Sequence, residues 1–387
     1  MRIELSERLK KLPPYLFVEI DKAKKRAKDE GRDIIDLGVG DPDIPTPNFI
    51  IEALNKAVKD PSTHRYALDQ GMPEFRKAAC EWFKKRFGVA LDYENEIHPL
   101  IGSKEGIAHI PLAFINPGDI VLVPDPCYPP YRSGTIFADG EVLTMPLIEK
   151  NHFLPDLKAI NHHLLHRTKM IFINYPNNPT AAVCDKKFLK DVVEFAKKHN
   201  IIVCQDAAYS EVAFDGFKPP SILEIEGAKD VAVEFHSLSK TFNMTGWRIG
   251  FVCGNAELVK GLGKVKSNID SGIFSAIQRA GIVAFENYEK HINSVIKIYA
   301  ERRDVLVDGL NKLGWNLEKP KATFYVWAKV APRHTSATFA KDLLDKADIV
   351  VTPGNGFGES GEGYIRMAIT VDKKRLAEAV DRIKKRL

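Results

Sequence analysis

The sequence predicts an α/β protein in which a large domain, built on a mostly parallel sheet flanked by helices, is joined to a smaller α+β domain. Two observations lead to this prediction. Short apolar runs typical of buried strands alternate with helical patterns through the middle of the chain, an order that is typical of parallel sheets. At 387 residues the chain is also too long for one small domain, so two domains are expected.

The predicted strands of the large domain are short apolar runs in the middle of the chain. Helical patterns, such as the one at 186–199, lie between several of them. Functional groups of such sheets gather at the carboxyl ends of the strands, so we expect the functional site there. The runs are 119–124, 169–175, 201–206, 231–237 and 250–254.

The C-terminal part of the chain has a different pattern. A long helical pattern at 275–313 is able to link two domains, and the elements that follow it predict a smaller α+β unit. These elements are strands at 322–330, 349–351 and 363–370 and helices at 336–346 and 372–385. A helix at 14–31 is expected to pack on this unit, so that the N- and C-terminal parts form it together. We therefore predict an N-terminal segment at 1–45, a large domain at 46–285 and a small domain at 286–387.

Composition and charge exclude several classes of function. The net charge of +5 is spread without a basic block, so binding to nucleic acid or to a membrane surface is not expected. No apolar run approaches the ~18 residues of a membrane span, and the N-terminus lacks the apolar core of a signal peptide. The five cysteines are odd in number and far apart, which favours free thiols and a cytoplasmic location. We interpret His162, His163 and His166 as a surface helix and predict no metal site, because no thiol lies near them.

The segment 237–248 contains the most informative chemistry. Lys240 lies just past the strand at 231–237, and a lysine that is partly deprotonated can form a Schiff base with an aldehyde. Ser237 before it and Arg248 after it are of the types that hold a phosphate dianion. One short segment therefore offers a lysine for covalent attachment and side chains that bind a phosphate, which predicts pyridoxal 5′-phosphate (PLP) as the cofactor.

Two further motifs are consistent with this cofactor. Ser103 and Lys104, between Gly102 and Gly106, open a helical pattern whose free N–H groups could bind a phosphate; the alternative is an ordinary helix start. Asn178 lies in a proline-rich turn after the strand at 169–175 and could point its amide at a ring oxygen of the cofactor. The alternative is a turn in which the asparagines only cap the backbone.

Two strand ends could contact the cofactor ring. Asp206 could pair with a protonated pyridine nitrogen, and Tyr209 could bond the phenolic oxygen; the alternative is a helix cap followed by a core tyrosine. Tyr128 could stack on the ring or could equally be a core residue.

Arg366 lies within an apolar strand, where it needs a partner. That partner could be Glu362 or the carboxylate of a substrate.

This ordered set of motifs resembles the class I/II aminotransferases of the fold type I PLP enzymes, over about 15–366. The resemblance implies that Lys240 carries the cofactor as an internal aldimine and moves the proton. It implies that Arg366, helped by the backbone at Gly40, binds the α-carboxylate of the substrate. It also implies a homodimer with shared sites, in which Tyr66 reaches the phosphate of the partner subunit. The cofactor contacts that it implies are Ser103, Lys104, Tyr128, Asn178, Asp206, Tyr209, Ser237 and Arg248. Ala181 departs from the glycine that is usual in this family.

Within the family, the segments 14–20 and 37–41, together with Lys104, make the chain most similar to the LL-diaminopimelate aminotransferases. This resemblance implies a ping-pong reaction in lysine biosynthesis, with glutamate as amino donor and tetrahydrodipicolinate as its acceptor. Asp69 of the partner subunit and Tyr15 are the candidates for binding the distal end of the substrate, and Lys104 is also expected to contact the substrate. The alternatives are an aspartate, alanine or aromatic transaminase, a PLP β-lyase, or a protein in which Lys240 is only structural.

Overall fold

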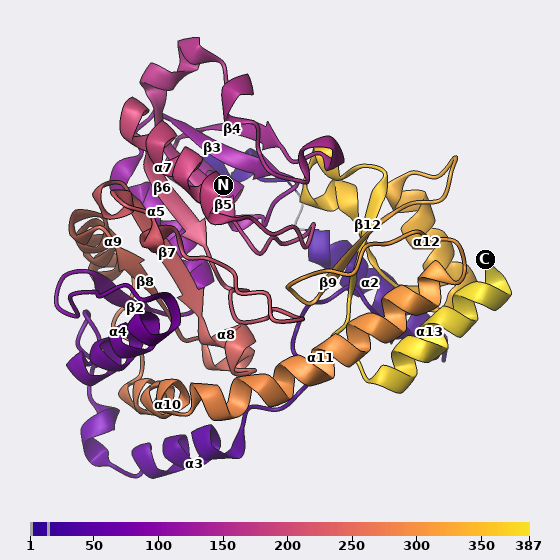
Figure 1. Cartoon of the computed structure of the whole chain (residues 1–387), viewed down its shortest axis with the longest axis horizontal. Coiled ribbons are helices and arrows are strands. Elements are labelled where there is room, and N and C mark those ends of the chain that lie inside the picture. Colours follow the sequence, from indigo (N-terminus) through magenta and orange to yellow (C-terminus); the bar gives the residue numbers. More distant parts are fainter. Residues whose placement is uncertain (1–2, 14–15) are drawn as a thin grey trace.

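The computed structural model describes residues 3–13 and 16–387, and its central feature is a seven-stranded sheet in the order β2-β8-β7-β6-β5-β3-β4 (Figure 1). Strands β4, β3, β5, β6 and β7 are parallel, whereas β8 runs antiparallel to both of its neighbours. The strands are β2 (Ile97–Leu100), β3 (Ile120–Asp125), β4 (Glu141–Pro146), β5 (Thr168–Asn174), β6 (Ile202–Asp206), β7 (Ala232–Ser237) and β8 (Gly250–Gly254). The mostly parallel sheet is confirmed, and each predicted strand begins and ends within a residue or two of the observed one.

Strands β2 and β4 were not predicted, and their sequences explain why. The edge strand β4 is largely exposed, so its sequence lacks a continuous apolar run. Strand β2 contains a histidine and a proline, residues that are uncommon in buried strands.

Helices cover both faces of the sheet, because successive side chains of each strand point to opposite sides. In β3, Leu122 packs into one core cluster with helices α4 and α7, whereas Val121 and Val123 pack into another with α5 and α9. Burial on both faces explains why the strands appear in the sequence as continuous apolar runs. The helices of this part are α3 (Asn48–Ala57), α4 (Pro73–Phe87), α5 (Ser103–Phe114), α6 (Pro130–Phe137), α7 (Lys186–His199), α8 (Leu238–Thr241), α9 (Ala256–Ile269) and α10 (Ser275–Glu286).

A second, smaller unit has its own core and combines both ends of the chain. Its antiparallel sheet has the order β11-β12-β9, and β1 pairs in parallel with β10. Arg32 Nε donates to Asp348 Oδ1 at 2.7 Å and fastens the N-terminal segment to it. The elements are α1 (Glu7–Lys10), α2 (Leu16–Asp29), β1 (Ile35–Asp36), α11 (Tyr288–Asn311), β9 (Tyr325–Lys329), α12 (Ser336–Ala347), β10 (Ile349–Val350), β11 (Thr352–Pro353), β12 (Tyr364–Ala368) and α13 (Lys373–Arg386). The exact division at 45 and 285 stays a prediction.

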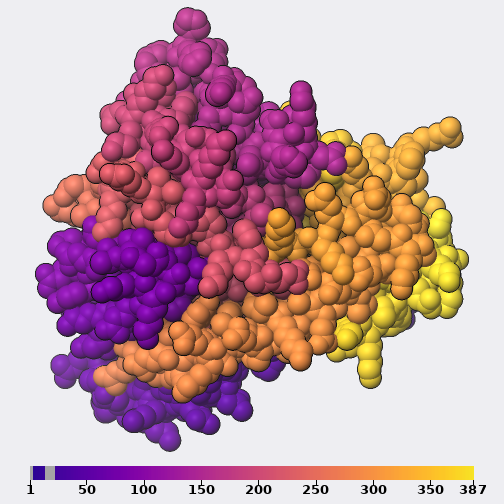
Figure 2. Space-filling model, in the orientation of Figure 1, coloured from indigo at the N-terminus to yellow at the C-terminus, as the bar shows by residue number. Residues whose placement is uncertain are grey.

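The long helical pattern predicted at 275–313 forms two helices, α10 and α11, rather than one. The break lies at Asn287, whose side-chain amide donates to the backbone oxygen of Val283 at 2.9 Å. Such a local hydrogen bond competes with the helical backbone pattern. Helix α11 then extends from the large sheet to the smaller unit, and its orange surface joins the two parts in Figure 2.

Two further sequence-based expectations concern the histidine-rich segment and membrane-spanning helices. The segment with His162, His163 and His166 forms a short 3-10 helix, His162–Arg167, and these histidines are exposed, as predicted for a surface helix. A search of the described helices finds none with the length and apolar character needed to cross a membrane.

Candidate active site

The predicted site residues come together at the carboxyl ends of β5, β6 and β7. In the sheet register, Asn174 is the partner of Asp206, and Asp206 is the partner of Phe235. Lys240 follows β7 on the short helix α8, which begins after Ser237. The expectation from parallel-sheet topology, that functional groups gather at strand ends, is therefore met here.

Lys240 is held inward with an altered basicity. Its Nζ donates to the backbone oxygen of Gly40 at 3.0 Å. Burial lowers the pKa of Lys240 to about 8; the Asp41 carboxylate opposes this shift, and the positive charges of Arg366 and Arg248 add to it. A lysine with this pKa has a substantial neutral fraction near physiological pH, which is the state that attacks an aldehyde.

The lowered pKa of Lys240 gives a prediction for the apoenzyme. Below pH 8 the Nζ is mostly protonated and has no lone pair, so the rate of reaction with added PLP is expected to rise about tenfold per pH unit and to level off above pH 8. Stopped-flow absorbance of the bound cofactor measures this rate. Lys240→Ala is the control and should lack this phase. A midpoint near 10.5, the ordinary value for a lysine, would contradict the prediction.

Asp206 is buried beneath the site and is oriented by two donors. The Tyr131 hydroxyl donates to its Oδ2 at 2.8 Å, and the backbone N–H of Ala208 donates to its Oδ1 at 3.1 Å. Burial raises the pKa of Asp206, while these two hydrogen bonds oppose the rise. A carboxylate in this position is stabilised further by any cationic partner, such as a protonated ring nitrogen. Tyr131 was not predicted, and the only signal for it is a tyrosine near the turn that follows β3.

Two tyrosine hydroxyls meet on the small-unit side of the site. The Tyr209 and Tyr325 hydroxyl oxygens lie 2.7 Å apart, and burial raises the pKa of Tyr209 well above its ordinary value. A Cβ added at Gly40 would lie 2.3 Å from the ring of Tyr325, so only glycine fits there. Tyr325 was not predicted, because a tyrosine in an apolar strand has the sequence pattern of a core residue. Tyr209 therefore lies in the site, in contact with a residue that the sequence did not indicate.

Arg366 links the smaller unit to the large sheet. Its Nη1 donates to Asn178 Oδ1 at 2.7 Å, and its Nη2 donates to the backbone oxygen of Gly38 at 2.7 Å. Its guanidinium carbon lies 4.2 Å from the ring centroid of Tyr325. Glu362, the alternative partner, instead accepts hydrogen bonds through Oε1 from the backbone of Ser336 and Gly363. Arg366 is therefore held between Asn178 of the large sheet and Gly38 of the N-terminal segment.

The residues predicted to bind the phosphate surround the beginning of β8. Gly250 is paired with Ser237 on one side, and a Cβ added to it would lie 3.1 Å from the backbone nitrogen of Ser103, the first residue of α5. Arg248 donates to the backbone oxygen of Ile101 at 3.4 Å, and a Cβ at Gly102 would lie 2.5 Å from its Nη2. Hydroxyls, a guanidinium and a helix N-terminus therefore converge, which fits a phosphate beside Lys240.

Four further residues that were predicted to belong to the site have the following positions. Tyr128 lies beside Tyr131, with ring centroids 5.9 Å apart, and Lys104 is exposed on the first turn of α5. Tyr66 is 95% exposed and Asp69 is exposed in the same loop, as expected if they serve a partner subunit. The predicted contact of Tyr15 lies outside the described residues.

Comparisons with known proteins agree with this geometry. Residues 32–383 match the family described as aminotransferase class I and II. The LL-diaminopimelate aminotransferase of Aquifex aeolicus is 56% identical over 98% of both chains, and that of Halothermothrix orenii is 52% identical over 99% of this chain and 98% of the relative. The solved structure of BacF from Bacillus subtilis superposes with a TM-score of 0.95 at 41% identity, over 100% of this chain and 98% of that chain. The chain therefore belongs to the class I and II aminotransferases, a family of PLP-dependent enzymes.

Proposed function

We propose that the protein is an LL-diaminopimelate aminotransferase, which exchanges an amino group between LL-diaminopimelate and 2-oxoglutarate in lysine biosynthesis. The observation that carries this substrate is the identity of 51–56% to curated enzymes of that name, over nearly the whole chain. Tetrahydrodipicolinate is then the acceptor and glutamate the donor. The converging groups at Lys240, Asp206 and Arg366 support the reaction type.

The positions of the predicted cofactor-binding residues support the following roles. When bound, PLP supplies a ring that withdraws the electron pair left on the substrate carbon after deprotonation. Ser103, Ser237 and Arg248 would hold its phosphate. Asp206 would accept a hydrogen bond from the protonated ring nitrogen, with Tyr131 fixing the orientation of the carboxylate. The electron-withdrawing state of the ring depends on that ion pair.

Lys240 would act as the base and acid of the reaction. Its Nζ, hydrogen-bonded to the Gly40 oxygen, would remove the proton from the α-carbon of the substrate and return it to the cofactor side. The lowered pKa is suited to this task, because a catalytic base works best when its pKa lies near the working pH.

Arg366 and Asn178 would bind substrate and cofactor together. The amide oxygen of Asn178 accepts from Arg366, which leaves the amide NH₂ to donate toward the ring oxygen, beside Tyr209. The guanidinium of Arg366 would bind the α-carboxylate, with the backbone at Gly40 as a further contact. One hydrogen-bond network would then connect the arginine that binds the substrate carboxylate to the ring of the cofactor.

The substrate is tested by a half-reaction. The PLP enzyme is mixed separately with LL-diaminopimelate, meso-diaminopimelate, aspartate, alanine and phenylalanine, and conversion of the cofactor to its amine form is followed by absorbance. Rapid conversion with the LL isomer alone supports the proposal. Comparable or faster conversion with aspartate or phenylalanine would retain the aminotransferase and replace the substrate.

A homodimer is part of the proposal, because part of the site would come from a second subunit. Tyr66 is 95% exposed, Leu68 is 67% exposed and Phe274 is 43% exposed. A Cβ at Gly272 would lie 2.2 Å from the Leu68 oxygen, so this loop packs against the segment before α10. Such an apolar surface is typical of a subunit interface. Sedimentation velocity should show a dimer, and a monomer would contradict the shared site.

Asp69 would bind the distal ammonium of the substrate across that interface. We expect Asp69→Asn to raise the KM for LL-diaminopimelate about 10- to 100-fold, as for loss of one charged hydrogen bond, and to leave the KM for glutamate unchanged. Steady-state kinetics with both substrates measure this difference. Asp381→Asn, at an exposed position of α13, is the matched control. An equal rise for both substrates would argue against distal recognition.

The cytoplasmic location is likewise part of the proposal. The cysteines Cys80, Cys127, Cys184, Cys204 and Cys253 are all buried free thiols. Thiols of this kind are expected in a reducing compartment. Fractionation of cells that produce the protein, with immunodetection, tests the location.

A further inference from the structure

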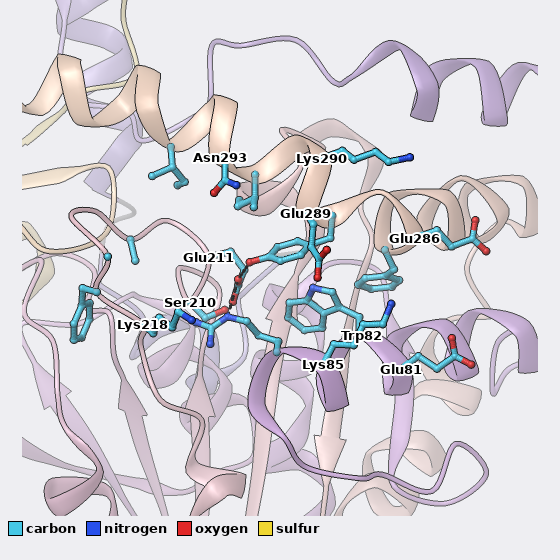
Figure 3. A pocket seen from close by; sticks show the side chains of 18 of the residues that line it. Glu81, Trp82, Lys85, Ser210, Glu211, Lys218, Glu286, Glu289, Lys290 and Asn293 are labelled. Carbon is cyan, nitrogen blue, oxygen red and sulfur yellow. Dashed lines mark hydrogen bonds and ion pairs between the residues drawn. The ribbon is translucent and has the colours of Figure 1, made fainter.

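Lys266 on α9 is the one buried lysine in the part of the chain that the structure describes, and its side chain is 2% exposed. It differs from the charged groups around the cavity of about 560 Å³ between α4, the beginning of α11 and the segment after β6. Figure 3 shows Glu81, Lys85 and Glu286 among the residues that line this cavity, and all three are exposed to water. Water does not solvate the ammonium of Lys266 in the same way, so it requires partners within the protein.

Two carboxylates from different elements pair with Lys266. Its Nζ donates to Glu105 Oε2 at 2.8 Å and to Asp270 Oδ1 at 2.9 Å. Glu105 lies in the first turn of α5, whereas Asp270 directly follows α9. Separation of these groups would leave an unpaired charge in the interior, which is strongly unfavourable. The lysine therefore holds both carboxylates in fixed positions.

The Glu105 arm reaches the phosphate-binding turn of the same subunit. Glu105 Oε2 also accepts from the backbone N–H of Ile101 at 3.1 Å. The backbone oxygen of Ile101 in turn accepts from Arg248 at 3.4 Å, and α5 begins two residues later, at Ser103. Lys266 thus fixes, through Glu105, the turn that would direct the helix N-terminus and the Ser103 hydroxyl toward the phosphate.

The Asp270 arm reaches the loop 66–72, which carries Tyr66. Gly272 lies two residues after Asp270, and a Cβ added to it would lie 2.2 Å from the backbone oxygen of Leu68. The two backbones are therefore in direct contact, with no room for a side chain between them.

Gln278 of α10 fastens the same contact from the interior. It is fully buried; its Oε1 accepts from the backbone N–H of Met72 at 2.7 Å, and its Nε2 donates to the backbone oxygen of Ile273 at 2.6 Å. One side chain thus joins the end of the loop 66–72 to the segment that begins at Asp270. A displacement of Asp270 would therefore be passed on to this loop.

One lysine is thus connected to two phosphate sites, because Tyr66 is expected to serve the partner subunit. We propose that Lys266 is a positioning residue for both: its Glu105 arm holds the phosphate-binding turn of its own subunit, and its Asp270 arm holds the loop that completes the site of the partner. Its ammonium is buried against two carboxylates, so it acts only through them. The proposal rests on the proposed homodimer with shared sites and not on the identity of the amino acid that is transaminated.

The first test compares cofactor binding with turnover. Lys266→Met keeps the length of the side chain and removes the ammonium. We expect it to bind PLP at least tenfold more weakly, with kcat at saturating PLP within about threefold of the unchanged enzyme, because the reacting groups remain in place. The dependence of activity on PLP concentration measures both values. Lys229→Met, which removes a different lysine–carboxylate pair, with Glu96 at 2.7 Å, is the matched control and should bind PLP normally. A lowered Tm with unchanged PLP binding would show a purely structural role and overturn the proposal.

Hybrid dimers separate the two arms. Two chains with different affinity tags are produced together, and one carries Lys240→Ala, so that only one site of the hybrid is active. With Lys266→Met on the chain that keeps Lys240, the active site has an altered turn and a normal partner loop. With Lys266→Met on the Lys240→Ala chain, it has a normal turn and an altered partner loop. Each hybrid is expected to need at least threefold more PLP for half-maximal activity than the reference hybrid without Lys266→Met. A match to the reference in either arrangement overturns the proposal.

Two further variants apply if Lys266→Met does not fold. Glu105→Gln should impair only the hybrid that carries it on the chain with Lys240, and Asp270→Asn only the hybrid that carries it on the other chain. No effect, or the opposite pattern, overturns the proposal. The reference hybrid, measured with the substrate that the half-reaction identifies, separates this outcome from a failure of the proposed function. If it is inactive, the transaminase with shared sites is wrong; if it is active and the variants match it, only the role of Lys266 is wrong.

Discussion

Lys240→Ala holoenzyme is expected to lose up to about 10⁴-fold in kcat while it remains folded. The variant lacks the amine that would move the substrate proton, and general acid–base groups contribute up to about this factor. The side chain lies inside the site, where its Nζ donates to the Gly40 oxygen and burial lowers its pKa to about 8. Single-turnover kinetics with LL-diaminopimelate, followed by absorbance of the cofactor, measure the loss.

Two comparisons make the result for Lys240→Ala specific. Lys384→Ala, at an exposed position of α13, removes the same group far from the site and should retain full activity. Added methylamine should restore part of the rate to Lys240→Ala, because a free amine can serve as the base. Loss of less than tenfold, or loss without rescue in a folded variant, would assign the proton transfer to another group.

Asp206→Asn is expected to lower kcat about 10²- to 10³-fold, the usual effect of removing one pre-organised charged partner. Asparagine is close to aspartate in size but has no charge to hold a proton on the ring nitrogen. The native carboxylate is buried and held by Tyr131 and the backbone of Ala208, so no solvent compensates for its loss. Steady-state kcat and the dissociation constant of PLP measure the effect.

Tyr131→Phe is the matched control for Asp206→Asn, because it removes the hydrogen bond to Oδ2 and leaves the charge in place. Its effect on kcat should be smaller, about tenfold, because the charge stays in place and the loss is that of one hydrogen bond to a charged group, about 1.5 kcal/mol at the lower end of the usual range. If Asp206→Asn keeps kcat within threefold, the ring is not held by this carboxylate. If Tyr131→Phe is as impaired as Asp206→Asn, the orientation of the group matters as much as its charge.

Much of the site could be predicted because its main residues lie in short motifs at strand ends. Lys240, Asp206 and Arg366 are charged residues next to or within apolar runs, and a buried charge requires a partner or a function. Topology then places the ends of parallel strands together without knowledge of any side-chain contact. Tyr131 and Tyr325 could not be predicted in this way, because a tyrosine has the same sequence pattern whether its hydroxyl orients a catalytic group or its ring only packs.

The sequence by itself determined the α/β fold, the reactive lysine and the main cofactor groups, because periodicity and residue type are local properties of the chain. The tertiary structure alone decided two further matters. Burial and neighbouring charges lower the pKa of Lys240, and Arg366 pairs with Asn178 and Gly38 rather than with Glu362. Each depends on groups that are distant in the sequence, and the energy of a buried polar group is set by what surrounds it in space.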